Sequence, residues 1–181
     1  MNVDIPSSTD LVKILIVDSD EQMCQTLYGY LQDSGYFPVI ATDASLAFAA
    51  IDLEKPELIL CDLHLAPLGE QSFLSSVADA YGDLPVIVMS GEGQMSDVVD
   101  ALRLGAADFL MKPIKDLVVL EHAIERSLER YSLRHENMKY RAQLEQANGE
   151  LKTNLAVLEQ DQQAGLQIQL KMLPTLSLIH I

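Results

Sequence analysis

The sequence contains only two cysteines, Cys24 and Cys61, and no tryptophan. Both cysteines lie within apolar patterns, away from any cysteine or histidine spacing typical of metal sites, so we expect buried, reduced thiols and a cytoplasmic protein. No apolar run approaches the roughly 20 residues of a membrane-spanning helix. The first ten residues, MNVDIPSSTD, lack the apolar segment of a signal peptide, and we expect a flexible tail there.

Basic residues are scarce in the first part of the chain. Residues 1–120 contain 5 Lys and Arg against 19 Asp and Glu, whereas residues 121–181 contain 7 against 8. An acidic surface repels nucleic-acid phosphate, which argues against nucleic-acid binding and favours a divalent cation or a basic partner. Hydrophobic residues make up 49% of the 181 residues, enough for a sizeable core.

Short apolar segments alternate with segments of helical periodicity. They predict strands over residues 13–17, 37–41, 58–61, 86–89 and 107–111. Helices are expected over about 20–33, 43–54, 70–80 and 94–104, and a last one from about residue 116. This alternation predicts an α/β fold with a parallel sheet covered by helices on both faces. Periodicity alone leaves the strand order open.

The last helix is expected to be long, because no proline occurs between Asp116 and Leu173. Leucines recur at intervals of seven, which predicts a short coiled coil and a homodimer, through Leu144, Leu151 and Leu158 with Leu155 beside them. The other core column would hold Asn148, Leu155 and Gln162. The alternative is a long helix that folds back on the domain or frays.

Polar residues stand at the ends of four of the five expected strands. They are Asp18, Asp62, Ser90 and Lys112. Parallel strands deliver their carboxyl ends to one sheet edge, so these side chains could converge there. A carboxylate that is relieved of repulsion by a divalent cation can attack a phosphoryl group, and a hydroxyl and an ammonium can bind its oxygens. Taken singly, an Asp after a strand is more often a turn residue.

Four stretches resemble the signatures of the receiver domain of bacterial two-component response regulators. They are ILIVD ending at Asp18, LILCD ending at Asp62, VIVMSG ending at Gly91 and DFLMKP ending at Pro113. The resemblance covers residues 11–130 and implies a flavodoxin-like five-stranded sheet of order 2-1-3-4-5. It implies phosphorylation of Asp62 by a histidine kinase or phosphotransfer protein, with no other enzymatic activity.

The same resemblance assigns the site. Asp18, Asp62 and the backbone carbonyl of His64 would hold Mg²⁺, with Asp20 as a further candidate. Ser90 and Lys112 would bind the phosphate, Phe109 would swing inward on activation, and the peptide bond between Lys112 and Pro113 would be cis.

The sequence departs from the family pattern in two places. Ser19 stands where a second acid usually follows Asp18, which puts Mg²⁺ affinity in doubt. In the loop after Asp62, Pro67 and Gly69 stand one residue away from their usual spacing, so its shape could differ.

The chain after residue 130 predicts a helical linker over 131–173. Gln167–Pro174 resembles the lead-in to metal-dependent serine/threonine phosphatase domains, and ALRLGAADFLMKP and DLVVLEHA resemble receivers that control a general-stress sigma factor. This implies a sigma-factor or anti-sigma-antagonist pathway. We expect residues 174–181 to begin a missing effector or to be non-native.

Two alternatives remain open from the sequence. A receiver that is never phosphorylated could act as a docking module, which Ser19 favours and the intact Asp18, Asp62, Ser90 and Lys112 oppose. A flavodoxin-like nucleotide binder would need a phosphate-binding loop after the first strand, but the segment DSDEQM is acidic and lacks glycine.

Overall fold

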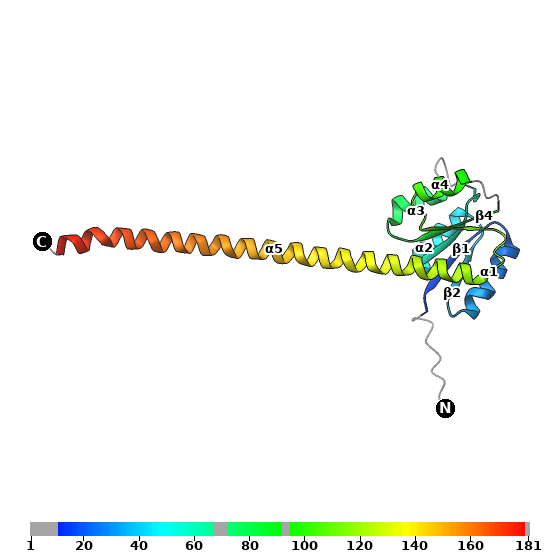
Figure 1. The fold of residues 1–181 in the computed structure, drawn as a ribbon, viewed down its shortest axis with the longest axis horizontal. Coiled ribbons are helices and arrows are strands. Elements are labelled where there is room, and N and C mark those ends of the chain that lie inside the picture. The colour runs from blue at the N-terminus through cyan, green and yellow to red at the C-terminus, as the bar shows by residue number, and fades with distance from the viewer. Residues whose placement is uncertain (1–10, 67–71, 92–94, 180–181) are drawn as a thin grey trace, which may run out of the picture. The chain divides into compact units, whose positions relative to one another are not determined.

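A computed structural model describes residues 11–66, 72–91 and 95–179, with side chains described up to residue 168. Five parallel strands form one sheet in the order β2-β1-β3-β4-β5. Figure 1 shows this sheet with helices packed around it. The flavodoxin-like fold and its strand order, predicted from the sequence, are therefore confirmed.

The strands are short and apolar. Nearly all residues of the three central strands are buried, whereas the two edge strands are partly exposed. Their bounds are β1 Lys13–Val17, β2 Phe37–Ala41, β3 Leu58–Asp62, β4 Val86–Ser90 and β5 Asp108–Met111. Buried β-branched and leucine runs suit a sheet that is covered on both faces. Two of the strands include, as their last residue, a predicted site residue, Asp62 in β3 and Ser90 in β4.

The helices begin close to where the periodicity places them. They are α1 Glu21–Asp33, α2 Ala44–Glu54, α3 Phe73–Tyr81, α4 Met95–Arg103 and α5 Leu117–Ile179. Four begin after residues whose side chains accept hydrogen bonds from backbone amides of the first turn: Asp20 before α1, Asp43 before α2, Ser72 before α3 and Asp116 before α5. Such caps satisfy amides that have no partner within the helix.

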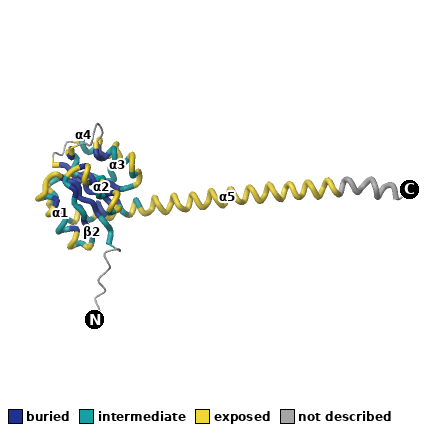
Figure 2. Tube along the Cα trace, turned by 180° about the vertical axis from the view of Figure 1, so that it is seen from behind, coloured by how far each residue is buried: buried dark blue, intermediate teal, exposed yellow. Residues whose placement is uncertain are grey.

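Alternation along the strands divides the core into two clusters, one on each face of the sheet. Leu15, Val17, Ile59 and Val88 belong to the cluster beneath α2 and α3. Ile14, Ile16, Leu60 and Met89 belong to the other, with residues of α1 and α5. Figure 2 shows that buried residues concentrate in the strands.

The chain divides into two compact units, Met1–Leu133 and Arg134–Ile181. In the first, the root of α5 packs through Leu120, Ala123 and Ile124, and the Tyr30 hydroxyl donates to the Leu117 carbonyl over 3.1 Å. In the second unit, every residue from 134 to 168 is exposed.

Helix α5 ends at Ile179, beyond Leu173, where the sequence analysis had placed its end. Among the described residues, no helix is long and apolar enough to cross a bilayer.

Candidate functional site

Asp18 and Asp62 meet Lys112 at the carboxyl edge of the sheet. The Lys112 Nζ atom lies 2.5 Å from Asp18 Oδ2 and 2.8 Å from Asp62 Oδ1. The sheet order explains the meeting, because β1 and β3 are neighbours and β5 lies across β4 from β3. One ammonium therefore bridges two carboxylates that come from strands far apart in the sequence.

The cluster is largely withdrawn from solvent. The side chains of Asp18, Asp62 and Lys112 are 2%, 12% and 17% exposed. Burial by itself would lower the pKa of the Lys112 ammonium, but its hydrogen bonds to Asp18 and Asp62 and their negative charges outweigh burial and raise the pKa. Lys112 is thus held protonated beside the carboxylates, and it neutralises part of their mutual repulsion.

Local hydrogen bonds hold Asp18 in place. Its Oδ1 atom accepts from the Asp20 amide over 2.9 Å, and its own amide donates to the Ala41 carbonyl over 3.2 Å. Asp20 itself is exposed, and its Oδ1 atom accepts from the amides of Gln22 and Met23. One oxygen of the Asp20 carboxylate is therefore occupied by capping α1.

The metal-binding capacity of this edge rests on two acidic side chains. Within the described ranges, no group of three or more His, Cys, Asp and Glu residues lies close enough to hold a metal ion. Asp20 does not join Asp18 and Asp62 in such a group, and Ser19, which follows Asp18, is exposed. The oxygens of Asp18 and Asp62 are hard donors of the kind Mg²⁺ prefers, so these two residues fit the ion.

The other predicted residues occupy different surroundings. Ser90 is fully buried at the end of β4, and its carbonyl accepts from the Lys112 amide over 2.7 Å. Phe109 lies opposite Val88 in the sheet register and packs, half-buried, against the cluster beneath α2 and α3.

Three further predictions concern the loops. His64 is exposed in the turn after β3. The bond between Lys112 and Pro113 is cis, as the resemblance implied. Pro67 and Gly69 lie outside the described residues.

The two cysteines contact the carboxylate site, which the sequence analysis missed. Cys61 Sγ donates to the Asp62 carbonyl over 3.2 Å, and Cys24 Sγ donates to the Asp18 carbonyl over 3.3 Å. Burial, followed by the charge of Asp62, raises the pKa of the Cys61 thiol well above its usual range. Burial and the Asp18 charge raise that of Cys24. In the sequence, only the position of Cys61 directly before Asp62 indicated that a thiol could lie next to the site.

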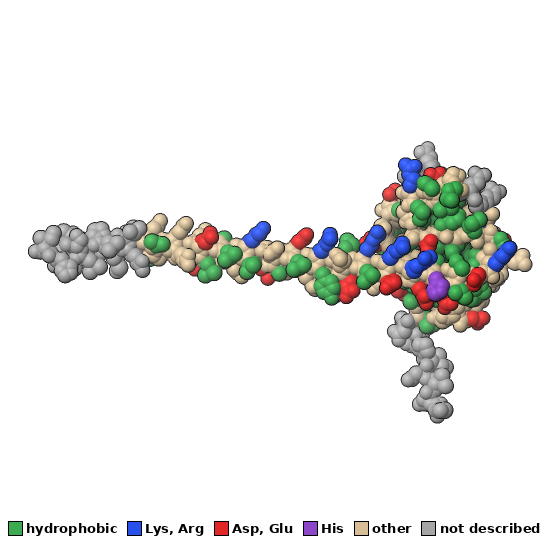
Figure 3. All heavy atoms as spheres, viewed as in Figure 1, with side chains coloured by type: hydrophobic (Ala, Val, Ile, Leu, Met, Phe, Trp, Pro, Cys, Tyr) green, Lys and Arg blue, Asp and Glu red, His purple; other side chains and the backbone are tan. Residues whose placement is uncertain are grey.

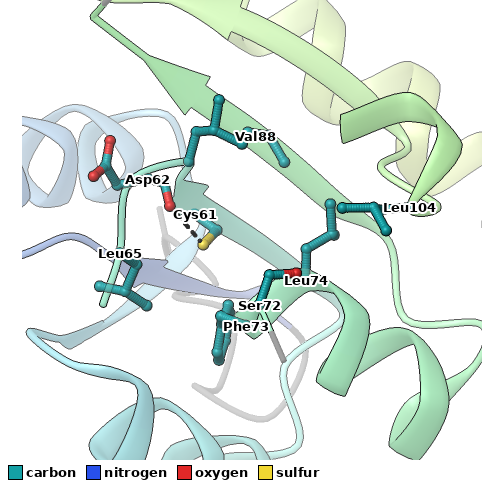
Figure 4. A pocket seen from close by; sticks show the side chains of 9 residues that line it. Cys61, Asp62, Leu65, Ser72, Phe73, Leu74, Val88 and Leu104 are labelled. Atoms are coloured by element: carbon teal, nitrogen blue, oxygen red, sulfur yellow. Dashed lines mark hydrogen bonds between the residues drawn. The ribbon is translucent and has the colours of Figure 1, made fainter. Parts of the chain in front are cut away.

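A small cavity of about 50 Å³ lies behind Asp62. Figure 4 shows that it is bounded by side chains of β3, β4 and α3, and that the Asp62 carboxylate points away from Phe73 and Leu74. The cavity is mainly apolar. It therefore offers little for binding a charged ligand, and the chemistry of this edge belongs to the opposite side of Asp62.

The predicted dimer residues lie on the second unit. Leu144, Leu151, Leu155 and Leu158 are 52–66% exposed along α5. The first unit therefore carries the charged site, and the second carries a row of exposed leucines.

Comparison with known proteins supports a common origin for the first unit. The sequence profile described as "Response regulator receiver domain" matches residues 14–125. The nitrogen assimilation regulatory protein NtrX of Azorhizobium caulinodans is 36% identical over 127 residues, which cover 68% of this chain and 27% of that protein. The Regulator of RpoS of Escherichia coli is 31% identical over 105 residues, 58% of this chain and 31% of that protein.

A solved structure agrees with the same assignment. The crystal structure of a CheY-like response regulator receiver domain protein from Methanospirillum hungatei superposes with a TM-score of 0.62 at 27% identity. The match covers 69% of this chain and 99% of that one. The chain thus spans less than a third of the two curated relatives described above, but includes a complete counterpart of this isolated domain.

Proposed function

The chain belongs to the response regulator receiver domain family, and we propose that it accepts a phosphoryl group on Asp62 and passes the signal along α5 to an effector. The observation that carries this proposal is the contact of one Lys112 ammonium with both Asp18 and Asp62. A partly buried carboxylate beside a fixed positive charge is suited to attack an electrophile whose other oxygens are anionic.

In the proposed reaction, an Asp62 oxygen forms a bond to the phosphorus of the donor. The bond between phosphorus and the donor's leaving atom breaks, and the electron pair of that bond leaves with the donor. Lys112 binds an anionic oxygen of the transferred group, and the Ser90 hydroxyl, at the end of the neighbouring strand, donates to another. The chain performs no other catalysis.

Magnesium would be held by the carboxylates of Asp18 and Asp62 with the backbone carbonyl of His64. When bound, it supplies positive charge to the phosphoryl oxygens. Ser19 leaves one ligand position with a neutral oxygen, and the exposed Asp20 is a weaker candidate because it caps α1. We therefore expect Mg²⁺ to bind more weakly than it would with an acid at residue 19.

The proposed donor is a histidine kinase or a phosphotransfer protein, in the cytoplasm. Relay to α5 has a structural route: Met111 and Pro113, which flank Lys112, line a surface depression together with Val119 of α5. A shift of Lys112 toward a phosphoryl group would move Met111 and Pro113 relative to Val119. We propose that this shift, together with the inward movement of Phe109, alters the root of α5.

The effector is proposed to lie beyond α5. NtrX and the Regulator of RpoS are both named as regulators. The named relatives give no support to the phosphatase effector implied by residues 167–174, and the sigma-factor or anti-sigma-antagonist pathway implied by the sequence stays a proposal. We also propose that the exposed leucine row of α5 forms a homodimer.

A second candidate is a docking module that works without phosphorylation. The specific observation in its favour is Ser19, since the described acidic side chains form no group of three at this edge. The buried contacts of Lys112 with two carboxylates favour the phosphorylated receiver.

The deciding experiment is intact-mass spectrometry after incubation with Mg²⁺ and acetyl phosphate. One added phosphoryl group that is lost in Asp62→Ala is the expected result. Asp52→Ala, which removes a carboxylate from α2, serves as the matched control and should still be labelled. Label that persists in Asp62→Ala would place the acceptor at another residue. If neither the wild type nor Asp52→Ala is labelled, by acetyl phosphate or by a cognate kinase, the docking module is favoured.

A further inference from the structure

The exposed part of α5 carries an apolar face that no described residue covers. Counted along the helix, Leu133, Tyr140, Leu144, Ala147, Leu151 and Leu158 lie seven, four, three, four and seven residues apart, and Asn137 and Asn154 divide the two longer intervals into four and three. Leu133, Tyr140, Leu144, Leu151 and Leu158 are each 57–66% exposed. A row with this spacing is the core seam of a two-stranded coiled coil, in which a second helix covers the apolar side chains.

Opposite charges line the two flanks of this seam. One flank carries Glu129 and Glu136, seven residues apart, and the other carries Arg134 and Arg141 with the same spacing. All four side chains are exposed. In Figure 3 basic side chains follow the upper edge of α5, with hydrophobic side chains below them.

We propose that α5 pairs with α5 of a second copy of this chain as a parallel, in-register coiled coil along Leu133–Leu158. In this arrangement a residue on one flank faces the residue five positions later in the other helix. Glu129 would therefore meet Arg134 of the second copy, and Glu136 would meet Arg141 of the second copy. By the two-fold symmetry each contact occurs twice.

An antiparallel pair is disfavoured by the same charges. In an antiparallel pair over the same segment each flank faces its own counterpart, so Glu136 would lie near Val157 and Arg141 near Asn148, and neither would meet an opposite charge. The leucines alone would permit either orientation, whereas only the parallel pair gives the charged residues opposite partners.

The charges also select the register. In the pairing expected from the sequence, Asn148, Leu155 and Gln162 fill the second core column. The flanking contacts would then be Tyr140 with Glu145, Ala147 with Lys152 and Asn154 with Glu159, none of which joins opposite charges. The register proposed here instead places Tyr140, Ala147 and Asn154 in that column and moves Leu155 to a flank.

Asn137 gives a direct test of orientation, because it lies in the proposed core between Leu133 and Tyr140. In the parallel pair, residue 137 meets its own counterpart. In an antiparallel pair over the same segment, the two copies of residue 137 would be roughly 25 Å apart along the axis. A disulfide needs Cα atoms within about 7 Å, so it can form only in the parallel case.

The experiment is mild oxidation of the full chain carrying Asn137→Cys, followed by a non-reducing gel. A covalent dimer is expected, while Lys139→Cys, on the same turn but away from the seam, should give little. The wild type is the blank, since Cys24 and Cys61 are buried. No covalent dimer from Asn137→Cys, or equal yields at the two positions, would overturn the proposed orientation.

Charge reversal tests the pairing itself. Glu136→Arg and Arg141→Glu should each weaken dimerisation roughly tenfold in analytical ultracentrifugation, and the double variant should recover most of the loss. Lys139→Glu, away from the seam, should leave the dissociation constant unchanged. A double variant as weak as the single ones would refute the contact between residues 136 and 141.

The inference rests on the homodimer proposed above and not on phosphorylation, so all these measurements are made without a phosphodonor. A wild type that stays monomeric would overturn both the dimer and its orientation and leave the chemistry of Asp62 untouched. A dimer without cross-linking at residue 137 would overturn the orientation alone.

Discussion

The Lys112 ammonium lies 2.8 Å from Asp62 Oδ1, although 50 residues separate them in the sequence. The same nitrogen contacts Asp18, so the residue proposed to be phosphorylated already shares its positive partner with a second acid. A phosphoryl group on Asp62 would compete with Asp18 for Lys112. This competition would provide the proposed receiver with a physical switch, because new charge on one carboxylate redistributes an existing contact.

Removing the shared cation should slow phosphorylation. We expect Lys112→Ala to lower the rate of labelling by acetyl phosphate roughly 100-fold, since fixed charges at the reacting group contribute on this scale. Stopped time points analysed by intact mass give the rate. Lys115→Ala removes an exposed lysine three residues away and should keep the wild-type rate. Equal rates in the two variants would contradict the role assigned to Lys112.

The raised pKa of Lys112 also predicts a pH dependence of stability. Because the folded state holds this proton more tightly than the unfolded chain, the stabilisation is complete below the usual value of 10.5. It is lost as the pH rises from 10.5 through the folded-state pKa. The gap in unfolding free energy between wild type and Lys112→Met should therefore narrow above pH 10.5.

Urea unfolding of both proteins between pH 9 and pH 11 measures this gap. The tyrosines with raised pKa values, Tyr36 and Tyr81, also reduce stability at high pH, but they do so equally in both proteins. The narrowing cannot exceed about 1.4 kcal/mol per pH unit for one group. A constant gap across this range would show that folding does not raise the pKa of Lys112.

The sequence was sufficient to predict the architecture. Short apolar runs that alternate with helical segments, together with the family signatures, specify the strands without knowledge of long-range contacts. Lys13–Val17 and Phe37–Ala41 agree with their predicted bounds. Helix α3 begins at Phe73, rather than near residue 70, because the Ser72 side chain caps its first turn. Such a shift depends on one hydrogen bond that periodicity does not reveal.

The site was predictable in its members but not in its contacts. Parallel strands place Asp18, Asp62, Ser90 and Lys112 at one edge, yet only coordinates show that Lys112 reaches both acids. The capping role of Asp20 and the thiol contacts of Cys24 and Cys61 likewise depend on side-chain directions.

The thiols beside the site should be slow to react. Because burial raises the pKa values of Cys24 and Cys61, little thiolate forms near neutral pH, and reagents reach the sulfur atoms only when the fold opens. We expect labelling by a disulfide reagent at pH 8 to be at least about 100-fold slower than for the urea-unfolded chain. The Lys139→Cys variant provides an exposed thiol for comparison, and rapid labelling of the wild type would refute the buried contacts.

Restoring an acid beside Asp18 should strengthen magnesium binding. In Ser19→Asp a third carboxylate would stand next to the pair of Asp18 and Asp62, and more negative oxygen ligands raise the affinity for a hard cation. Calorimetric titration with Mg²⁺ should show a dissociation constant lower by roughly tenfold, which corresponds to about 1.4 kcal/mol. Ser34→Asp makes the same substitution at the far end of α1 and should change nothing. If both variants bind Mg²⁺ like the wild type, residue 19 lies outside the ion's reach, and the ion must be held by Asp18, Asp62 and backbone or water oxygens alone.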